Sequence, residues 1–258
     1  MQPLSPGRPL TDYFDSPARR ETFVRSLFDT CAPDYDRVCR IAAFGQGQRY
    51  RRDALGRAGL VAGMRVLDVA TGTGLTASEA IALVGPAGRV VGVDPSSGML
   101  REARRVGYNA ARGLGEALPF TDGSFDLVCM GYALRHLADL TVAFGEFRRV
   151  LRPGGHVVVL EITEPRSRIA AWLAKQYFQR VVPALTPNTT RPDSAGVLMR
   201  YYWDTIHSCV EPAAILDALR NGGFEDVRRE VVHHVFSEYI GRRSQDSGPQ
   251  RSDLSAST

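Results

Sequence analysis

Cysteine is scarce in this sequence, and its placement excludes several classes of protein. The four cysteines, Cys31, Cys39, Cys129 and Cys209, form no C-x-x-C pair and no grouping with histidine. This spacing is not that of a zinc site or of a disulfide framework. We therefore expect a reduced, cytoplasmic protein with no metal at its functional site.

Long apolar runs and long basic runs are also missing. No stretch approaches the roughly 20 apolar residues of a membrane-spanning helix, and the N-terminus lacks a signal-peptide pattern. The net charge is +4 and the pI is about 9.0, but the arginines stand singly or in pairs beside acidic residues. We expect no integral membrane segment and no nucleic-acid partner, because scattered arginines are typical of a solvated surface.

The length and composition suit one domain. The chain has 258 residues, of which 44% are hydrophobic, enough to fill a core. Polar ends predict a disordered segment over residues 1–16 and a disordered tail over 242–258. Residues 17–241 are predicted to form a single domain, with a helical lid over 17–60 and a helical substrate-side insertion over 163–210.

Alternating hydrophobic patterns predict an α/β fold. Strand patterns alternate with helix patterns in the first two thirds of the chain, which is typical of a mostly parallel, Rossmann-like sheet. The expected strands are 65–70, 89–94, 109–112, 125–131 and, after a turn at 153–155, 156–162. Helices are expected over 166–182 and 193–221, followed by an antiparallel C-terminal edge formed by 224–232 and 235–240.

Two short segments predict a nucleoside site. Val66–Gly74 reads V-L-D-V-A-T-G-T-G, typical of a buried strand that ends in an acidic, glycine-rich turn before a helix. Val90–Asp94 predicts the next parallel strand, which ends in a carboxylate. Asp94 follows Gly74 by 20 residues, the spacing expected between a glycine turn and the acidic group that binds a ribose.

Asp68 helps to decide which nucleoside binds. The pattern Gly72-x-Gly74-x-x-Ala77 also satisfies the dinucleotide fingerprint, so NAD remains an alternative. A carboxylate in the turn would repel a pyrophosphate, whereas it would attract the cationic ammonium and sulfonium of S-adenosylmethionine. We interpret the turn as a site for this methyl donor, with a structural turn aspartate as the alternative reading of Asp68.

A longer set of motifs carries a family resemblance. They are Phe28-Asp29, Ala32-Pro33-x-Tyr35-Asp36, Phe44-Gly45, Arg51-Arg52, Leu67–Ala70, Asp94, Met99-Leu100, Glu116–Phe120, Phe125-Asp126, Leu134-Arg135, Arg149–Gly155 and Gly223-Phe224. With these motifs the chain resembles class I S-adenosylmethionine-dependent methyltransferases, and among them the ubiquinone/menaquinone biosynthesis C-methyltransferase family. The resemblance covers roughly residues 28–224. It implies S-adenosyl-L-methionine as cofactor and S-adenosyl-L-homocysteine as product.

The resemblance also implies which residues hold the cofactor. Asp94 would accept the ribose hydroxyls, unless it only caps the helix that begins near Ser96. Where the family usually has an acidic or amide residue for adenine, this chain has Leu114 and Gly115, so the base would rest on the Gly115 N–H and pack against Leu114 and Pro95, unless Glu116 substitutes. Gly131, at the end of its strand, is also expected to contact the cofactor. The methionine part would contact Asp68, Ala70, Gly72, Thr73 and Gly74.

The acceptor is expected beside the segment Tyr132–His136, where class I enzymes commonly meet their substrate. No Asn/Asp-Pro-Pro-aromatic motif is present, which argues against methylation of adenine or glutamine amino groups. No cysteine arrangement suits covalent C5 methylation of a pyrimidine. A small molecule is therefore the expected acceptor. A homodimer is compatible with this size and lid.

His136 and Arg135 are the predicted catalytic residues. His136 has the pKa range to accept a proton from a phenol or hydroquinol, and Arg135 could hold the resulting phenolate. A structural histidine is the alternative for His136. A flat aromatic acceptor would be lined by aromatic side chains, although such side chains are also common in cores. The candidates are Tyr35, Tyr132, Trp172, Tyr177 and Tyr202.

The sequence thus predicts a methyltransferase for small molecules. The methyl group would pass to carbon or oxygen of an aromatic or quinol-like acceptor, in quinone or specialised-metabolite biosynthesis. Two alternatives remain open at this point: a nucleic-acid methyltransferase acting on tRNA, and a cofactor-binding protein of the same fold without methyl transfer.

Overall fold

A seven-stranded sheet forms the centre of the protein in a computed structural model, which describes residues 4–105, 107–186, 189 and 193–245. The strand order is β3-β2-β1-β4-β5-β7-β6. The first five strands are parallel, and β7 lies antiparallel between β5 and β6. This confirms the predicted fold class. The strands are β1 Arg65–Val69, β2 Arg89–Asp94, β3 Asn109–Arg112, β4 Phe125–Gly131, β5 Leu151–Ile162, β6 Phe224–Val232 and β7 Phe236–Arg243.

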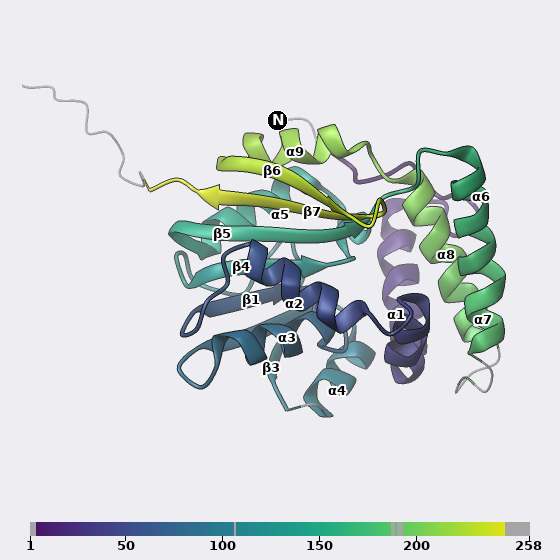
Figure 1. Ribbon diagram of the computed structural model, residues 1–258, viewed down its shortest axis with the longest axis horizontal. Helices are drawn as coiled ribbons and strands as arrows, with labels where there is room; N and C mark the ends of the chain where they lie inside the picture. The colour runs from purple at the N-terminus through teal and green to yellow at the C-terminus, as the bar shows by residue number, and fades with distance from the viewer. Residues whose placement is uncertain (1–3, 106, 187–188, 190–192, 246–258) are drawn as a thin grey trace, which may run out of the picture.

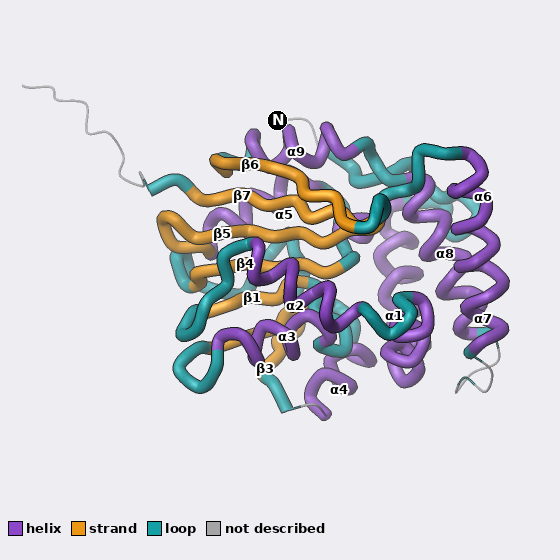
Figure 2. Tube along the Cα trace, in the orientation of Figure 1, coloured by secondary structure: helices purple, strands orange, loops and turns teal. Residues whose placement is uncertain are grey.

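Helices cover both faces of the sheet (Figures 1 and 2). Successive side chains of a strand point to opposite faces of the sheet. The strands therefore contribute apolar side chains to two clusters, one on each face. One cluster is completed by α5 Leu140–Val150 and α9 Pro212–Asn221. The opposite cluster is completed by α2 Gly47–Arg57, α3 Leu75–Val84 and α4 Ser97–Arg105.

A third helical layer stands at the carboxyl ends of the parallel strands, on the right in Figure 1. It has its own apolar cluster, to which α1, α7 and α8 contribute. The segments predicted as lid and insertion therefore meet at the edge where ligands bind in open α/β sheets. The elements of this layer are α1 Pro17–Ala42, α6 Arg168–Gln176, the π-helical turn η2 Tyr177–Val181, α7 Val182–Leu185 and α8 Ser194–Ser208.

The chain ends differ from the prediction of disorder. From Leu4 on, the N-terminal segment is ordered: the Leu4 N–H donates to Asp139 Oδ1 at 3.2 Å, and the Val210 N–H donates to the Pro6 carbonyl at 2.9 Å. The segment thus provides a hydrogen-bond acceptor for a backbone N–H group between α8 and α9, which would otherwise lack a partner in the protein. At the other end, β7 extends through Arg243, past the predicted boundary at 241. Residues 1–3 and 246–258 lie outside the described residues.

Two internal boundaries also differ. The predicted turn at 153–155 is part of β5, where the pairing shifts from Phe125↔Leu151 to Leu127↔His156 and the extra residues bulge. The predicted helix over 193–221 is divided into α8 and α9. Pro212 is the first residue of α9, a position that favours proline because the N–H that proline lacks would have no partner within the helix there.

Gly74 gives a direct test of how the turn before α3 is built. Its φ of +97° is left-handed, and a Cβ atom there would overlap the Tyr108 ring. We expect Gly74→Ala to lower the free energy of unfolding by about 2–4 kcal/mol, from backbone strain and overpacking together. Denaturant unfolding measures this change.

Gly145→Ala is the matched control for this substitution. Gly145 lies within α5 and has open space around it, so alanine should raise stability by up to about 1 kcal/mol. A Gly74→Ala protein as stable as the unmodified chain would contradict the described turn.

Candidate functional site

The turn between β1 and α3 lets the backbone approach a ligand closely. Ala70, Gly72 and Gly74 all have left-handed φ values, of 52°, 59° and 97°. The Thr71 N–H donates to the Val93 carbonyl at 3.0 Å, which ties the turn to the end of β2. A Cβ atom on Gly72 would meet only Met99 Sδ, at 4.0 Å. We call this turn, residues 70–74, the cradle. It is open on the Gly72 side and tightly packed on the Gly74 side.

Asp94 joins the two strand ends that bound this cradle. Its Oδ2 accepts from the Gly72 N–H and its Oδ1 accepts from the Ser96 N–H, both at 2.8 Å. A carboxylate oxygen has two acceptor sites, so each oxygen can still accept one more hydrogen bond. That capacity matches the two hydroxyls of a ribose. The helix cap itself is Ser96, whose Oγ accepts from the Met99 N–H at 3.1 Å.

The carboxylate of Asp68 does not face the open side of the turn. This differs from the expectation that it attracts the cofactor directly. Its side chain is buried, with 1% exposed. Oδ2 accepts from Thr71 Oγ1 at 2.7 Å, and Oδ1 accepts from Cys129 Sγ at 3.4 Å. A direct contact with a sulfonium is thus not what this geometry supports. The carboxylate fixes the turn and contributes its negative charge from behind it.

Helix α1 closes over the cradle through two aspartates. Asp29 Oδ1 accepts from Ser96 Oγ at 2.6 Å and from the Gly98 N–H at 2.7 Å. Asp36 accepts a hydrogen bond from the hydroxyl of Thr73, the predicted cofactor contact. No role for these aspartates was predicted from the sequence. Their spacing of seven residues places them on one helix face and was a usable signal.

The predicted adenine segment lies next to Asp94. The Gly113 N–H donates to the Asp94 carbonyl at 3.3 Å, and Leu114 pairs with Ala117 as an isolated bridge, with 39% of Leu114 exposed. Glu116 Oε1 accepts from the Ala138 N–H at 2.6 Å, so this carboxylate holds the loop in place. Leu114 is available for packing against a base, and Pro95 stands directly after Asp94 in the chain.

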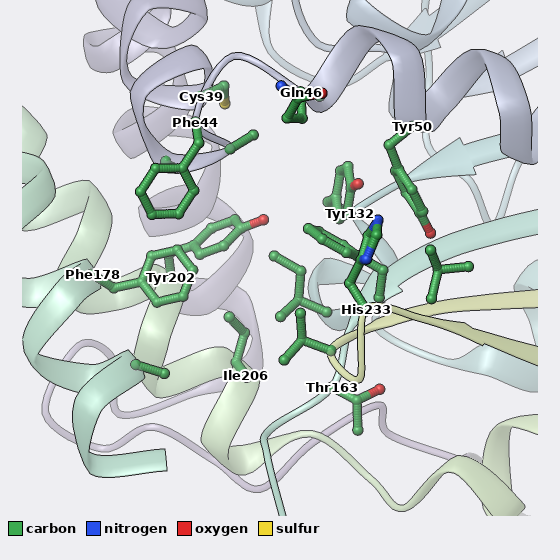
Figure 3. A pocket seen from close by; sticks show the side chains of 18 of the residues that line it. Cys39, Phe44, Gln46, Tyr50, Tyr132, Thr163, Phe178, Tyr202, Ile206 and His233 are labelled. Carbon is green, nitrogen blue, oxygen red and sulfur yellow. The ribbon is translucent and has the colours of Figure 1, made fainter. Parts of the chain in front are cut away.

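A cavity of about 740 Å³ lies beside the cradle, between the helical layer and the strand ends. Four of the five predicted aromatic residues line it: Tyr35, Tyr132, Tyr177 and Tyr202. Figure 3 shows Tyr132 and Tyr50 on one side of this space and Phe44, Phe178 and Tyr202 on the other. Other lining residues were not predicted, because they come from segments far apart in the sequence. They include Phe44, Tyr50, Arg51, Phe178 and Phe236.

Tyr132 lines the cavity and follows β4, the strand that pairs with β1 beside the glycine turn. It follows Gly131 at the end of β4 and has a left-handed φ of 61°, which is rare for a bulky residue. A Cβ atom at Gly131 would lie 2.5 Å from Thr76 Oγ1, so only glycine lets β4 approach α3 this closely. Burial raises the pKa of Tyr202 to about 12 and raises that of Tyr35 and Tyr132 above the usual value. These phenols therefore keep their protons near neutral pH.

Trp172 is not part of this cavity, contrary to the prediction. It lies on the outer side of α6 with 59% of its surface exposed, whereas Ala174 and Phe178 of the same helical run line the cavity. Successive helical residues are about 100° apart, so Trp172 and these two residues occupy different faces. The aromatic composition of the segment was not sufficient to tell the faces apart.

Arg135 lies behind the cavity wall. Its Nη1 pairs with Glu161 Oε1 at 2.6 Å, both side chains being buried, and its guanidinium lies 4.6 Å from the Tyr202 ring centroid. A catalytic contact was predicted for Arg135. The geometry instead has it support Tyr202 from behind.

His136 also faces away from the cavity. Its ring stacks on Tyr201 at 5.6 Å and meets Phe28 edge-on at 5.2 Å. Burial, followed by the charges of Arg135 and Arg20, lowers the pKa of His136 well below its usual value. His136 therefore binds a proton weakly, and its ring is packed among aromatic rings of α1 and α8. Both features make it a poor general base. The structural alternative for His136 is the one that the geometry supports.

Comparison with known proteins gives the family of this fold and site. The model of the "ubiE/COQ5 methyltransferase family" matches residues 17–236. The chain belongs to this family. It is an S-adenosylmethionine-dependent methyltransferase, which decides against the dinucleotide alternative and against a binding protein without methyl transfer.

Two curated relatives are similar over most of their length. A ubiquinone/menaquinone biosynthesis C-methyltransferase UbiE from Syntrophotalea carbinolica is 34% identical over 85% of this chain and 94% of its own. A demethylmenaquinone methyltransferase from Thermus thermophilus is 37% identical over 84% of this chain and 100% of its own. Among solved structures, an S-adenosylmethionine-dependent methyltransferase from Thermotoga maritima has a TM-score of 0.62 at 20% identity and covers 85% of this chain and 99% of that one. The last comparison bears on the fold alone.

The two aspartates near the cradle predict a pH-dependent cofactor affinity. Burial raises the pKa of Asp68 and of Asp94 to about 6. As the pH falls through 6 both carboxylates become neutral, and the attraction for a cation is lost. We expect the affinity for S-adenosylmethionine to fall about tenfold or more between pH 7.5 and pH 5.

S-adenosylhomocysteine is the control ligand, because it lacks the sulfonium charge. Calorimetric titration of both ligands should give a smaller decrease for S-adenosylhomocysteine. Equal decreases, or none, would show that these carboxylates do not act on the sulfonium charge.

Proposed function

We propose that this methyltransferase methylates a ring carbon of a hydroquinol that carries an apolar side chain. The observation that supports this acceptor is the 740 Å³ cavity, whose wall is mainly aromatic and aliphatic and includes Tyr132 at the end of β4. Its volume is within the range of ligand sites, roughly 300–1,000 Å³. The names of the relatives, which refer to C-methylation and to demethylmenaquinone, favour the same class of acceptor.

We assign the cofactor to the cradle beside this cavity. The backbone of Ala70, Gly72 and Gly74 would surround the methionine part, and Asp94 would accept the ribose hydroxyls. Leu114, Gly115 and Pro95 would pack around adenine. Thr73 would be freed for the cofactor when Asp36 of the lid releases its hydroxyl. S-adenosylmethionine supplies an electrophilic methyl group when bound.

Transfer to carbon needs an electron-rich ring. Loss of the hydroxyl proton of a hydroquinol moves electron density to the carbons beside that oxygen. One of them forms the new bond to the methyl carbon while the bond between methyl and sulfur breaks and its electron pair returns to sulfur. The methylated carbon then loses its proton and the ring becomes aromatic again. Alignment of the two reactants is the main contribution of the protein.

Arg51 is suited to favour the ionised acceptor. Its side chain is buried, with 8% of the residue exposed, and its Nε has no hydrogen-bond partner among the described residues. Its guanidinium carbon lies 5.1 Å from the Tyr132 ring centroid, in the cavity wall. Two other arginines of the same helix form ion pairs: Arg49 pairs with Asp53, and Arg52 pairs with Glu79. Arg51 forms no such ion pair within the described structure, so its charge is available to an oxyanion.

Assay of the purified protein with labelled S-adenosylmethionine tests the acceptor class. The acceptors are reduced demethylmenaquinone, the same ring without its side chain, and a set of simple phenols. We expect a C-methylated product from the quinol with the side chain, and a kcat/KM at least about tenfold lower without it, because burial of several methylene groups is lost. Turnover of phenols alone, or an O-methylated product, would reject the proposal in favour of a specialised-metabolite enzyme.

The role of Arg51 is tested by Arg51→Met. Loss of one group that stabilises a developing oxyanion typically lowers kcat by about 10²–10³. We expect a decrease of this size, with the affinity for S-adenosylhomocysteine unchanged and the remaining activity rising at alkaline pH, where the acceptor ionises unaided.

Arg104→Met is the control for Arg51→Met. Arg104 is exposed on α4 and is not among the residues that line the cavity, so its loss should leave kcat unchanged. Equal kcat values for Arg51→Met and Arg104→Met would show that Arg51 takes no part in the reaction.

A further inference from the structure

Exposed apolar side chains follow one another along the helical run from α6 to α7. Three of them lie close together on α6, and two more lie four residues apart at the end of η2 and the end of α7. No residue of α6 is buried. Single exposed apolar residues are ordinary, but a group of them on one helical run marks a surface that contacts something. The group, which we call the stripe, consists of Ile169 (73% exposed), Trp172 (59%), Leu173 (55%), Val181 (43%) and Leu185 (58%).

Positive charge surrounds the stripe. Arg166, Arg168, Lys175 and Arg180 are all exposed, and none of them pairs with a carboxylate of the described residues. The sequence has no aspartate or glutamate from residue 165 to residue 192. Arg168 and Lys175 are seven residues apart and therefore lie on the same side of α6. The run is an apolar stripe with a cationic border.

The helical run that carries the stripe also lines the acceptor cavity with other residues. Ala174, Tyr177 and Phe178 of the same helical run line that cavity. Phe44 stands at the rim, 76% exposed, with its ring stacked on Tyr177 at a centroid distance of 5.0 Å. Figure 1 places α6 and α7 at the outer edge of the molecule, and Figure 3 shows Phe44 and Tyr202 on the same side of the cavity. A surface that covers the stripe would therefore contact the outer face of a helical run whose other face lines the cavity, and it would reach the cavity wall at Phe44.

We propose that the α6–α7 stripe and Phe44 dock on an anionic lipid surface, with the helical run lying in the plane of the interface. Apolar side chains would enter the boundary between headgroups and acyl chains, while the cations would contact the anionic headgroups. Within the described residues no helix is long and apolar enough to cross a membrane, so the contact is peripheral.

Charge selects the lipid surface over a second copy of the chain. In a two-fold dimer the same patch meets itself, which would bring the four cations of each copy together. An anionic surface neutralises them instead. The inference deepens the proposed function, since an acceptor with an apolar side chain resides in a bilayer and would enter the cavity from there. Lipid binding itself is measurable without any acceptor.

Trp172 is a built-in reporter of this docking. The chain has two tryptophans, and the other, Trp203, is 4% exposed. In the full chain with the substitution Trp203→Phe, all tryptophan fluorescence comes from Trp172. We expect a blue shift of this emission, and quenching by brominated acyl chains, with vesicles that contain phosphatidylglycerol. Vesicles of phosphatidylcholine alone should give little change, and added salt should reverse the binding.

Paired substitutions separate the two parts of the surface. Arg168→Gln with Lys175→Gln should weaken binding to phosphatidylglycerol vesicles roughly 30-fold, since each cation near an anionic surface contributes roughly fivefold. Leu173→Ser with Ile169→Ser should remove the blue shift. Val61→Ser with Val142→Ser changes two other exposed apolar residues, which lie outside the stripe, and should have no effect.

Three results would overturn the docking proposal: no blue shift with anionic vesicles, equal binding to both vesicle types, or a blue shift without vesicles that grows with protein concentration. The last would assign the stripe to a second copy. Failure of the proposed function is distinguishable. Vesicle binding without quinol methylation would reject the acceptor alone, whereas methylation of a dispersed quinol without vesicle binding would reject the docking alone.

Discussion

The geometry of the site depends on the pair of hydrogen bonds that Asp94 accepts from the Gly72 and Ser96 N–H groups. They fasten the glycine turn of β1 to the start of α4, at the edge where β1, β2 and β4 end side by side. Because the carboxylate keeps acceptor capacity after making both bonds, one group can build the cradle and also bind the ribose. The lid aspartates and Tyr132 are positioned relative to this fixed edge.

Charge is divided between the two sides of the proposed reaction. Buried Asp68 and Asp94 provide negative charge on the cofactor side, where a sulfonium must be held. Arg51 provides positive charge on the acceptor side, where an oxyanion must be held. Placing fixed charges of opposite sign on either side of the transferred methyl favours the ionised acceptor without a strong general base. This arrangement is consistent with phenols and a histidine whose pKa values keep them from exchanging protons near neutral pH.

Local features of the sequence were sufficient for the fold and for part of the site. The glycine turn, Asp94 and the strand periodicity are each contained in a few consecutive residues, so their structure could be predicted. The orientation of Asp68, the outward face of Trp172 and the placement of Arg135 behind Tyr202 depend on packing between distant segments. The same is true of Arg51, whose importance follows from what surrounds it and not from its neighbours in the chain. The ordered segment from Leu4 was missed because its partners lie near residues 139 and 210.

A crystal structure with S-adenosylmethionine and a quinol analogue tests the account most directly. It should place the ribose hydroxyls on Asp94, the sulfonium methyl at the cavity wall beside Tyr132, and an oxygen of the analogue within hydrogen-bond distance of Arg51. A methyl group directed elsewhere would contradict the account. The clearest case would be a methyl group that faces the polar cavity lined by Glu164, His207 and Arg229 on the other side of β5.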